Sequence, residues 1–265
     1  MDSLFVSYVC FAESLAIYFV GLFVLVARLV IFVVHKTHKD MKRKKNLLEL
    51  FAGSRSVGNE AEKQGLNVFS VDWTAYEGID LNIDIGKLKK SHIPFIPDAV
   101  WASPDCTTYS IAGCGYHRKG NQKEGFKPIS EYALECDKVN IHWIKLIKSW
   151  QKENPKLIFF FENPRGMLRH MEWMKEFKRH TIWYCQYGDT RAKPTDIWTN
   201  SKTWTPKEVC KNYRYNKETG GIINKHCHHE GSRRGQNSGT QKMKNSFESS
   251  KIPKQLCKEI INSLI

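Results

Sequence analysis

Cysteine pairs of the CxxC type are absent from this sequence, although eight cysteines are scattered through its 265 residues. A chain of this length is also too large for a small fold held together by disulfides. We therefore expect the protein to work in a reducing compartment.

Acidic residues are scarce relative to basic ones. The 27 Asp and Glu face 41 Lys and Arg, which gives a formal net charge of +14. Such an excess favours a nucleic acid or an anionic membrane surface as partner, with an acidic protein as second choice. Apolar residues at 41% and charged residues at 26% exclude wholesale disorder. The length fits one α/β domain with a small insert.

Long hydrophobic runs are limited to one near the N-terminus, where Glu13 and Arg28 are the only charges between residues 4 and 34. The stretch 16–34 has the length of a membrane-spanning helix. The basic cluster that follows it, from His35 to Lys45, would keep the rest of the chain in the cytoplasm. Alternatively, Met41 is the natural start and residues 1–40 are an artefactual extension. Both interpretations stay open.

Beyond the basic cluster, short apolar runs alternate with helical patterns. Strands are expected at residues 46–50, 67–71, 81–85, 98–102, 157–161 and 181–187. Helices are expected up to about Gln64, from Tyr132 to Trp150, and over residues 165–178. This alternation predicts an α/β fold with a doubly wound, mostly parallel sheet over residues 46–199. Ligands of such sheets bind beyond the carboxyl ends of the strands.

Glycines and carboxylates follow the first three expected strands. Gly53 and Gly58 lie in FAGSRSVG, where a backbone without side chains lets a ligand approach. Asp72 follows the second strand and could grip ribose hydroxyls, and Asp84 could accept a hydrogen bond from an adenine amino group. A tight turn and solvated surface acids are the alternative interpretations.

The next two strands are followed by residues that suit covalent chemistry. Cys106 lies in the loop SPDCTTYS and is a candidate nucleophile, against the alternative of a buried structural cysteine. Glu162 directly follows LIFFF, where burial would make it a proton donor. Its alternative role is that of an acid at a helix start before Pro164.

Five segments occur together in one order: LELFAGSRSVG, then Asp72, SPDCTTYS, FFFENPRG and CQYGDTRAKPTDIW. In this order they resemble the DNA cytosine-5 methyltransferases, and most of all the short versions carried by phages and mobile elements. The segments GSRRGQNSGTQ and SSKIPKQLCKEI are similar to that subgroup as well. The resemblance covers the chain from about Leu47 to the C-terminus and implies a Rossmann-like methyltransferase fold.

The resemblance implies a definite mechanism on cytosine flipped out of double-stranded DNA. Cys106 would attack C6 of the ring, Glu162 would donate a proton to N3, and Arg191 would contact the base carbonyl. S-adenosylmethionine would be the methyl donor. The residues implied to bind it are Phe51, Ala52, Gly53, Gly58, Asp72, Trp73, Asp84 and Pro104.

Several positions depart from the family pattern. Asp105 replaces a second proline, Thr107 replaces glutamine, and Pro164 replaces valine. Only Arg191 fits a motif that often has two arginines, with Lys193 as a substitute for the second. An anion at Asp105 would disfavour the Cys106 thiolate.

The C-terminal part is basic and carries interleaved aromatic rings, as expected for contact with phosphates and bases. The resemblance implies a target-recognition segment over residues 200–245 and a helix returning to the catalytic domain over residues 246–265. Zinc binding is an alternative for Cys210 with Cys227 and its neighbouring histidines, but CxxC spacing is missing and we expect no metal site. The candidate zinc ligands are Cys210, His226, Cys227, His228 and His229.

Two other functions stay open at this stage. One is a tRNA cytosine-5 methyltransferase of the same fold. The other is an inactive, membrane-tethered nucleic-acid-binding protein, which would not need Cys106, Glu162 or Arg191.

Overall fold

The computed structural model describes residues 28, 43–113, 115–210, 214–215, 217–220, 222–224 and 246–265. The chain divides into two units, residues 1–44 and 45–265. Among the described helices none has the length and apolar character to cross a membrane. The stretch 16–34, apart from Arg28, lies outside the described residues, so the expected anchor stays a prediction.

A seven-stranded sheet forms the centre of the second unit, in the order β3-β2-β1-β4-β7-β9-β8. Neighbouring strands from β3 to β7 are parallel, and β9 runs antiparallel to both β7 and β8. The predicted doubly wound, mostly parallel α/β fold is therefore confirmed. The strands are β1 (Asn46–Leu50), β2 (Asn67–Asp72), β3 (Leu81–Asn82), β4 (Ala99–Ala102), β7 (Ile158–Pro164), β8 (Arg179–Trp183) and β9 (Pro194–Thr199).

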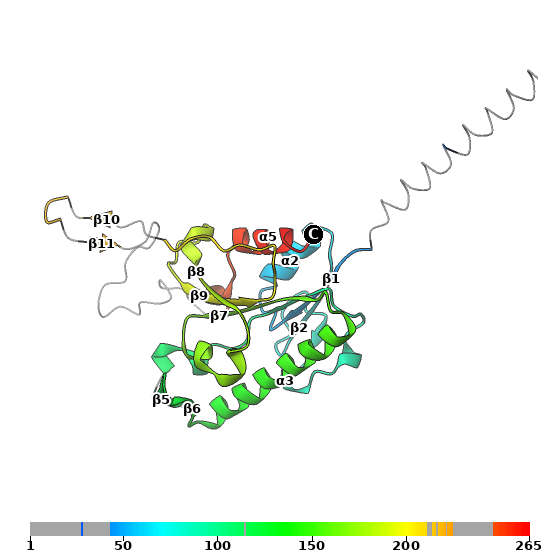
Figure 1. The fold of residues 1–265 in the computed structure, drawn as a ribbon, viewed down its shortest axis with the longest axis horizontal. Helices are drawn as coiled ribbons and strands as arrows, with labels where there is room; N and C mark the ends of the chain where they lie inside the picture. The colour runs from blue at the N-terminus through cyan, green and yellow to red at the C-terminus, as the bar shows by residue number, and fades with distance from the viewer. Residues whose placement is uncertain are drawn as a thin grey trace, which may run out of the picture. The chain divides into compact units, whose positions relative to one another are not determined.

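Both faces of the sheet are covered, which explains why its central strands are apolar throughout. Alternate residues of β1 point to opposite faces, so Leu48 packs beneath α3 (Glu131–Glu153) and Leu47 packs beneath α2 (Ser56–Lys63). Figure 1 shows α2 and α5 (Lys254–Asn262) on one side of the sheet and α3 on the other. The C-terminal helix α5 joins the α2 side of the core through Leu256, Cys257, Ile260 and Ile261.

Strand register brings the informative strand ends to one edge. Leu50 lies opposite Val71 of β2 and Ala102 of β4, and Ala102 lies opposite Phe161 of β7. The strand order reverses between β1 and β4, which is where such sheets bind ligands. Residues that follow Leu50 and Ala102 therefore stand at the expected binding edge.

Some predicted elements were wrong. The helix expected over residues 165–178 is replaced by two short 3-10 turns, Met167–His170 and Glu172–Met174. Its buried Leu168, Met171 and Met174 repeat every three residues, which suits a 3-10 turn as well as an α-helix.

The strand expected over residues 181–187 ends at Trp183 and continues as a 3-10 turn, Tyr184–Tyr187, closed by Gly188 at φ 80°. The expected strand at 81–85 is likewise only the two residues of β3 before a 3-10 turn at Ile85–Lys87. Sequence patterns also missed strand β9 and a small hairpin, β5 (Arg118–Asn121) and β6 (Gly125–Pro128).

Of the C-terminal region, the described residues contain α4 (Ser246–Ser250), α5 and a two-stranded piece, β10 (Arg214–Tyr215) with β11 (Ile222–Asn224). Most of the expected recognition segment at 200–245 lies outside the described residues beyond Cys210.

Candidate active site

The candidate nucleophile lies in the loop that leaves β4. Cys106 is half-buried and precedes a 3-10 turn at Thr107–Tyr109. The buried Pro104, two residues earlier, is held by its carbonyl, which accepts a hydrogen bond of 2.8 Å from the side-chain nitrogen of Asn163 in β7. The loops after β4 and β7 are thereby joined beside the switch point of the sheet.

Charged groups around Cys106 act on it in opposite directions. Burial raises the pKa of the Cys106 thiol, the Lys193 ammonium lowers it, and the carboxylates of Asp105 and Glu162 raise it further. The net pKa lies above the usual value, so the thiol form is favoured in the free protein. The charges of Lys193, Asp105 and Glu162 therefore all act on the Cys106 thiol.

Glu162 lies within β7 rather than after it, since the strand continues to Pro164. Its side chain is 4% exposed and accepts a hydrogen bond of 2.8 Å from the Tyr184 hydroxyl. Burial, reinforced by Glu162, raises the pKa of Tyr184 well above its usual range, so this hydroxyl stays protonated and remains a donor. Pro164, which the alternative interpretation placed at a helix start, ends the strand.

Arg191 is buried beside these groups and is strongly engaged. Its guanidinium forms an ion pair with Asp189 and donates to the carbonyls of Ser249, at 2.7 Å, and Lys251, at 3.1 Å. Burial lowers the pKa of Arg191, but the hydrogen bond and charge of Asp189, together with Tyr184 and Glu162, outweigh burial, so the net pKa is raised. Arg191 thus joins the site to the C-terminal segment.

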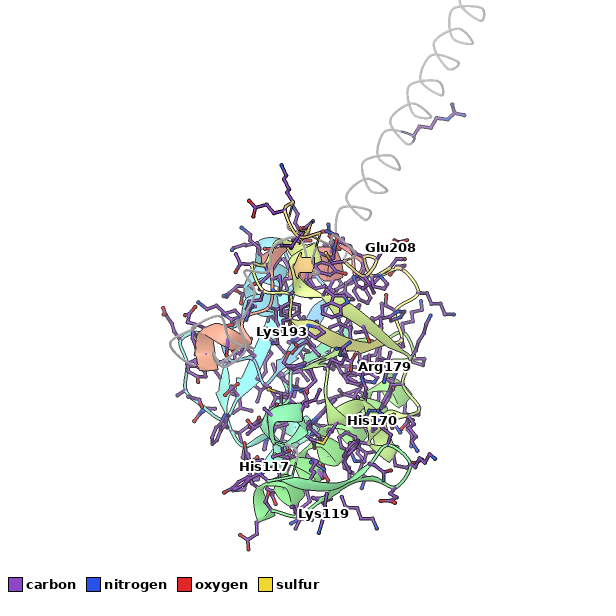
Figure 2. The ribbon with its side chains drawn as sticks, turned by 90° about the vertical axis from the view of Figure 1, so that its left-hand side faces the viewer. His117, Lys119, His170, Arg179, Lys193 and Glu208 are labelled. Atoms are coloured by element: carbon purple, nitrogen blue, oxygen red, sulfur yellow. The ribbon has the colours of Figure 1, made fainter. Side chains whose placement is uncertain are left out.

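Lys193 is the cation that acts on the thiol. Its ammonium lies 5.0 Å from the centre of the Tyr184 ring, and the Arg191 guanidinium lies 5.6 Å from the same ring. Tyr184 therefore contacts Glu162 through its hydroxyl and two cations through its ring. Figure 2 shows Lys193 near the middle of the molecule, and His117 and Lys119 of the β5–β6 region at its lower end.

The expected cofactor edge is organised by Asp72. Its carboxylate accepts the N–H of Gly53 at 2.9 Å and that of Thr74 at 2.8 Å, which ties the loop after β1 to the loop after β2. Phe51 and Gly53 both have positive φ, 55° and 49°. Only glycine adopts such a conformation without cost, so the turn at Phe51 is strained. Backbone strain of this kind is common where a protein contacts a ligand.

The two glycines that follow β1 differ in the free space around them. No atom lies within 4 Å of the place where a side chain at Gly53 would begin, and Trp73 is 75% exposed. A methyl group at Gly58, by contrast, would overlap the buried carboxylate of Glu49. Gly58 is therefore needed for packing of α2 against Glu49.

The other expected cofactor residues are placed as follows. Asp84 is exposed and accepts the N–H of Gly86 at 2.8 Å, so in this structure it caps a 3-10 turn. Ala52 is buried, and its N–H donates to the carbonyl of Val71 at 3.2 Å. Contact of these residues with a cofactor stays a prediction.

Two residues of this region, Tyr184 and Glu49, were not expected from the sequence. Tyr184 lay inside an expected strand and showed no sign of a partner. Glu49 did give a signal, because a carboxylate inside the apolar run NLLEL has to find buried donors. Those donors are the Gly58 N–H and the Ser70 hydroxyl, both at 2.9 Å.

Within the described part of the chain, no three His, Cys, Asp or Glu side chains gather as a metal site would require. Cys210 is buried, while Cys227 and the histidines beside it lie outside the described residues.

No family model and no curated protein matches the sequence. Among solved structures, the fold is similar to that of a DNMT2 mutant from Spodoptera frugiperda, with 16% identity and a TM-score of 0.40 over 64% of this chain and 54% of that one. It is also similar to the methyltransferase EhMeth from Entamoeba histolytica, with 12% identity and a TM-score of 0.42 over 63% of this chain and 57% of that one. The chain thus spans little more than half the length of either structure.

Proposed function

We propose that this chain methylates C5 of cytosine in DNA, using S-adenosylmethionine and a transient covalent bond to Cys106. The observation that carries the proposal is the 2.8 Å hydrogen bond from Asn163 to the Pro104 carbonyl, which joins the loop of Cys106 to the strand of Glu162 at the carboxyl edge of a doubly wound sheet. The charges of Glu162 and Lys193 both act on the Cys106 thiol there. A nucleophile, a buried acid and a cation in one place suit addition to an electron-poor ring. The resemblance of the motif segments supports the same reaction.

The residues divide the chemistry between them. The Cys106 sulfur would add to C6 of the cytosine ring while Glu162 holds a proton at N3, so that the electrons of the C5–C6 double bond become available at C5. Tyr184 fixes the carboxyl group of Glu162 through its hydrogen bond. After methylation at C5, loss of the C5 proton and breakage of the C6–S bond would release Cys106. Sulfur is suited to both steps, since it is a good nucleophile and a good leaving group.

The free thiol needs help to ionise, because its pKa is raised. Lys193 supplies part of that help, and expulsion of water by a bound base would strengthen it. In this proposal Lys193 stabilises the thiolate, and Arg191 holds the segment around Asp189 against the C-terminal residues 249–251.

The cofactor edge fits a nucleoside-like ligand in two respects. The open space at Gly53 admits a ligand close to the backbone, and the exposed Trp73 ring offers a stacking surface. S-adenosylmethionine would supply an electrophilic methyl group there. Asp72 would shape the site by holding the Gly53 and Thr74 amides.

DNA is proposed as substrate because the motif segments resemble DNA enzymes, and the net charge of +14 suits either nucleic acid. The test incubates the full chain with labelled S-adenosylmethionine and, separately, duplex DNA, single-stranded DNA and tRNA. Label at C5 of cytosine in DNA, lost in Cys106→Ser, is expected. Transfer to tRNA alone would overturn the choice of DNA, and no transfer by a folded protein would favour a nucleic-acid-binding role.

A further inference from the structure

Asp105 occupies a position next to the candidate nucleophile where the family resemblance predicts proline, and its carboxylate is bonded at both oxygens. One oxygen accepts the N–H of Thr107 at 2.6 Å, on the far side of Cys106. The other accepts the hydroxyl of Tyr132, in the first turn of α3. The first bond closes a turn around Cys106, and the second ties this turn to α3.

The start of helix α3, which carries Tyr132, is held in place by a capping residue. Its first turn is capped by Ser130, whose hydroxyl accepts the Ala133 N–H at 3.1 Å. The residues after Cys106 are also held, because the buried Arg118 donates to the carbonyl of Thr108 at 2.9 Å and to its hydroxyl at 3.2 Å. Cys106 thus lies between Asp105 and Thr108, and both residues are held by side-chain hydrogen bonds.

We propose that Asp105 is a positioning residue, which fixes the backbone of Cys106 through the Thr107 amide and the Tyr132 hydroxyl in place of the rigid ring of a proline. The catalytic consequence rests on the proposed function, but the positioning itself does not. Proline would restrict the backbone without any charge. Asp105 achieves the restriction by hydrogen bonds and adds a negative charge beside the sulfur.

The charge has a measurable consequence. Lys193, Asp105 and Glu162 are the charged groups that act on Cys106, and Asp105 is one of the two that disfavour its thiolate. Asparagine at this position would keep both hydrogen bonds, with its oxygen accepting from Thr107 and its nitrogen donating to the Tyr132 oxygen. It would remove the charge. Position and charge are therefore separable by Asp105→Asn and Asp105→Ala.

The first measurement is hydrogen exchange of the full chain, followed by mass spectrometry on the peptide covering residues 105–109. In Asp105→Ala and Tyr132→Phe we expect exchange about fivefold faster than in wild type, the order expected for loss of one hydrogen bond. Asp105→Asn should remain close to wild type. Glu135→Gln, which removes an exposed carboxylate paired with Lys138 on the same helix, is the matched control. Equal exchange in Asp105→Ala and Asp105→Asn would overturn the proposal.

The second measurement is alkylation of Cys106 by iodoacetamide as a function of pH, with buried Cys185 and Cys257 as internal references. The midpoint should move to lower pH in Asp105→Asn, and should not move in Glu135→Gln. In methyl transfer, Asp105→Ala should have a kcat about tenfold lower than Asp105→Asn at unchanged KM, because both variants lack the charge and only alanine loses the hydrogen bonds. Absence of methyl transfer in every variant, with the exchange differences intact, would refute the proposed function and leave the positioning role standing. Equal kcat in Asp105→Ala and Asp105→Asn would refute its catalytic importance.

Discussion

The hydroxyl of Tyr184 donates to Glu162 across 2.8 Å between two buried side chains. Glu162 comes from β7 and Tyr184 from the turn after β8, and β9 lies between those two strands in the sheet. The antiparallel strand β9 therefore sets the distance between β7 and β8 at which the Tyr184 hydroxyl reaches Glu162. Ring contacts with Lys193 and Arg191 make Tyr184 the common neighbour of Glu162 and of these two cations.

Tyr184→Phe should reduce methyl transfer by about tenfold to a hundredfold, because the carboxyl group of Glu162 loses the donor that orients it. Single-turnover rates with saturating DNA would measure the effect. Tyr187→Phe is the matched control, since Tyr187 is equally buried and its hydroxyl accepts the Lys207 N–H at 2.9 Å. Equal rates in the two variants would show that the hydroxyl of Tyr184 serves stability alone.

Lys193→Met should raise the pKa of Cys106 further, because the cation that favours the thiolate is removed. At a fixed pH near 8 the alkylation rate of Cys106 should fall about threefold or more. Lys193→Arg should retain most of the rate, since the charge remains. Lys207→Met removes another lysine that lies over a tyrosine ring, at 4.9 Å from Tyr187, and should leave Cys106 unaffected. A rate unchanged by Lys193→Met would contradict the proposed role.

The central part of the fold was predictable because its signals are local. Runs such as LIFFF are covered on both faces, so every residue is apolar and the strand is evident. The turns at Gly53 and Asp72 follow those strands directly. Cys106 and Glu162 could be placed at one edge of the sheet for the same reason, because parallel strands end together.

The remaining features depend on contacts between distant segments. β9, with the sequence PTDIWT, begins with proline and contains a buried aspartate, which resembles a loop until Asp196 is paired with Arg169. The hairpin β5–β6 is polar and is held by Arg118, whose partner Asp137 lies on α3. No pattern of residues close in the sequence predicts such a pairing. The hydrogen bond between Tyr184 and Glu162 also joins distant segments and was not predictable for the same reason.

Stability should depend on pH through Glu49. Burial raises the pKa of Glu49 to about 7, against hydrogen bonds from Gly58 and Ser70 that lower it. A raised pKa means that the folded state binds the proton more tightly than the unfolded chain. The resulting stabilisation is complete below about pH 4.5 and is lost as the pH rises through about 7. Over that range the difference amounts to about 3 kcal/mol as an upper bound.

Glu49→Gln removes this titration and should flatten the dependence of the unfolding free energy on pH between 5 and 8. Chemical denaturation at several pH values would measure it. Glu124→Gln, an exposed carboxylate on the β5–β6 turn, is the control for the loss of one negative charge. A slope in Glu49→Gln equal to that of wild type would show that Glu49 does not titrate in this range.

Replacing Arg118 should destabilise the protein strongly. Its side chain is fully buried, and it pairs with Asp137 at 2.7 Å. The guanidinium also lies 4.1 Å from the centre of the Tyr109 ring, whose hydroxyl donates to the same carboxylate at 2.6 Å. Arg118→Met leaves that carboxylate without its cation and should lower the unfolding free energy by about 3–5 kcal/mol.

The pairing can be isolated with a double-mutant cycle. Asp137→Asn alone leaves the buried cation of Arg118 without its anion, so it should also destabilise the protein strongly. The double variant Arg118→Met with Asp137→Asn removes both charges and should lose at least about 1 kcal/mol less than the sum of the two single changes. Lys148→Met with Glu176→Gln, an exposed ion pair at 2.6 Å, should be additive within error. Additivity at Arg118 and Asp137 would mean that the hairpin is held by its carbonyl contacts, with the ion pair contributing nothing of its own.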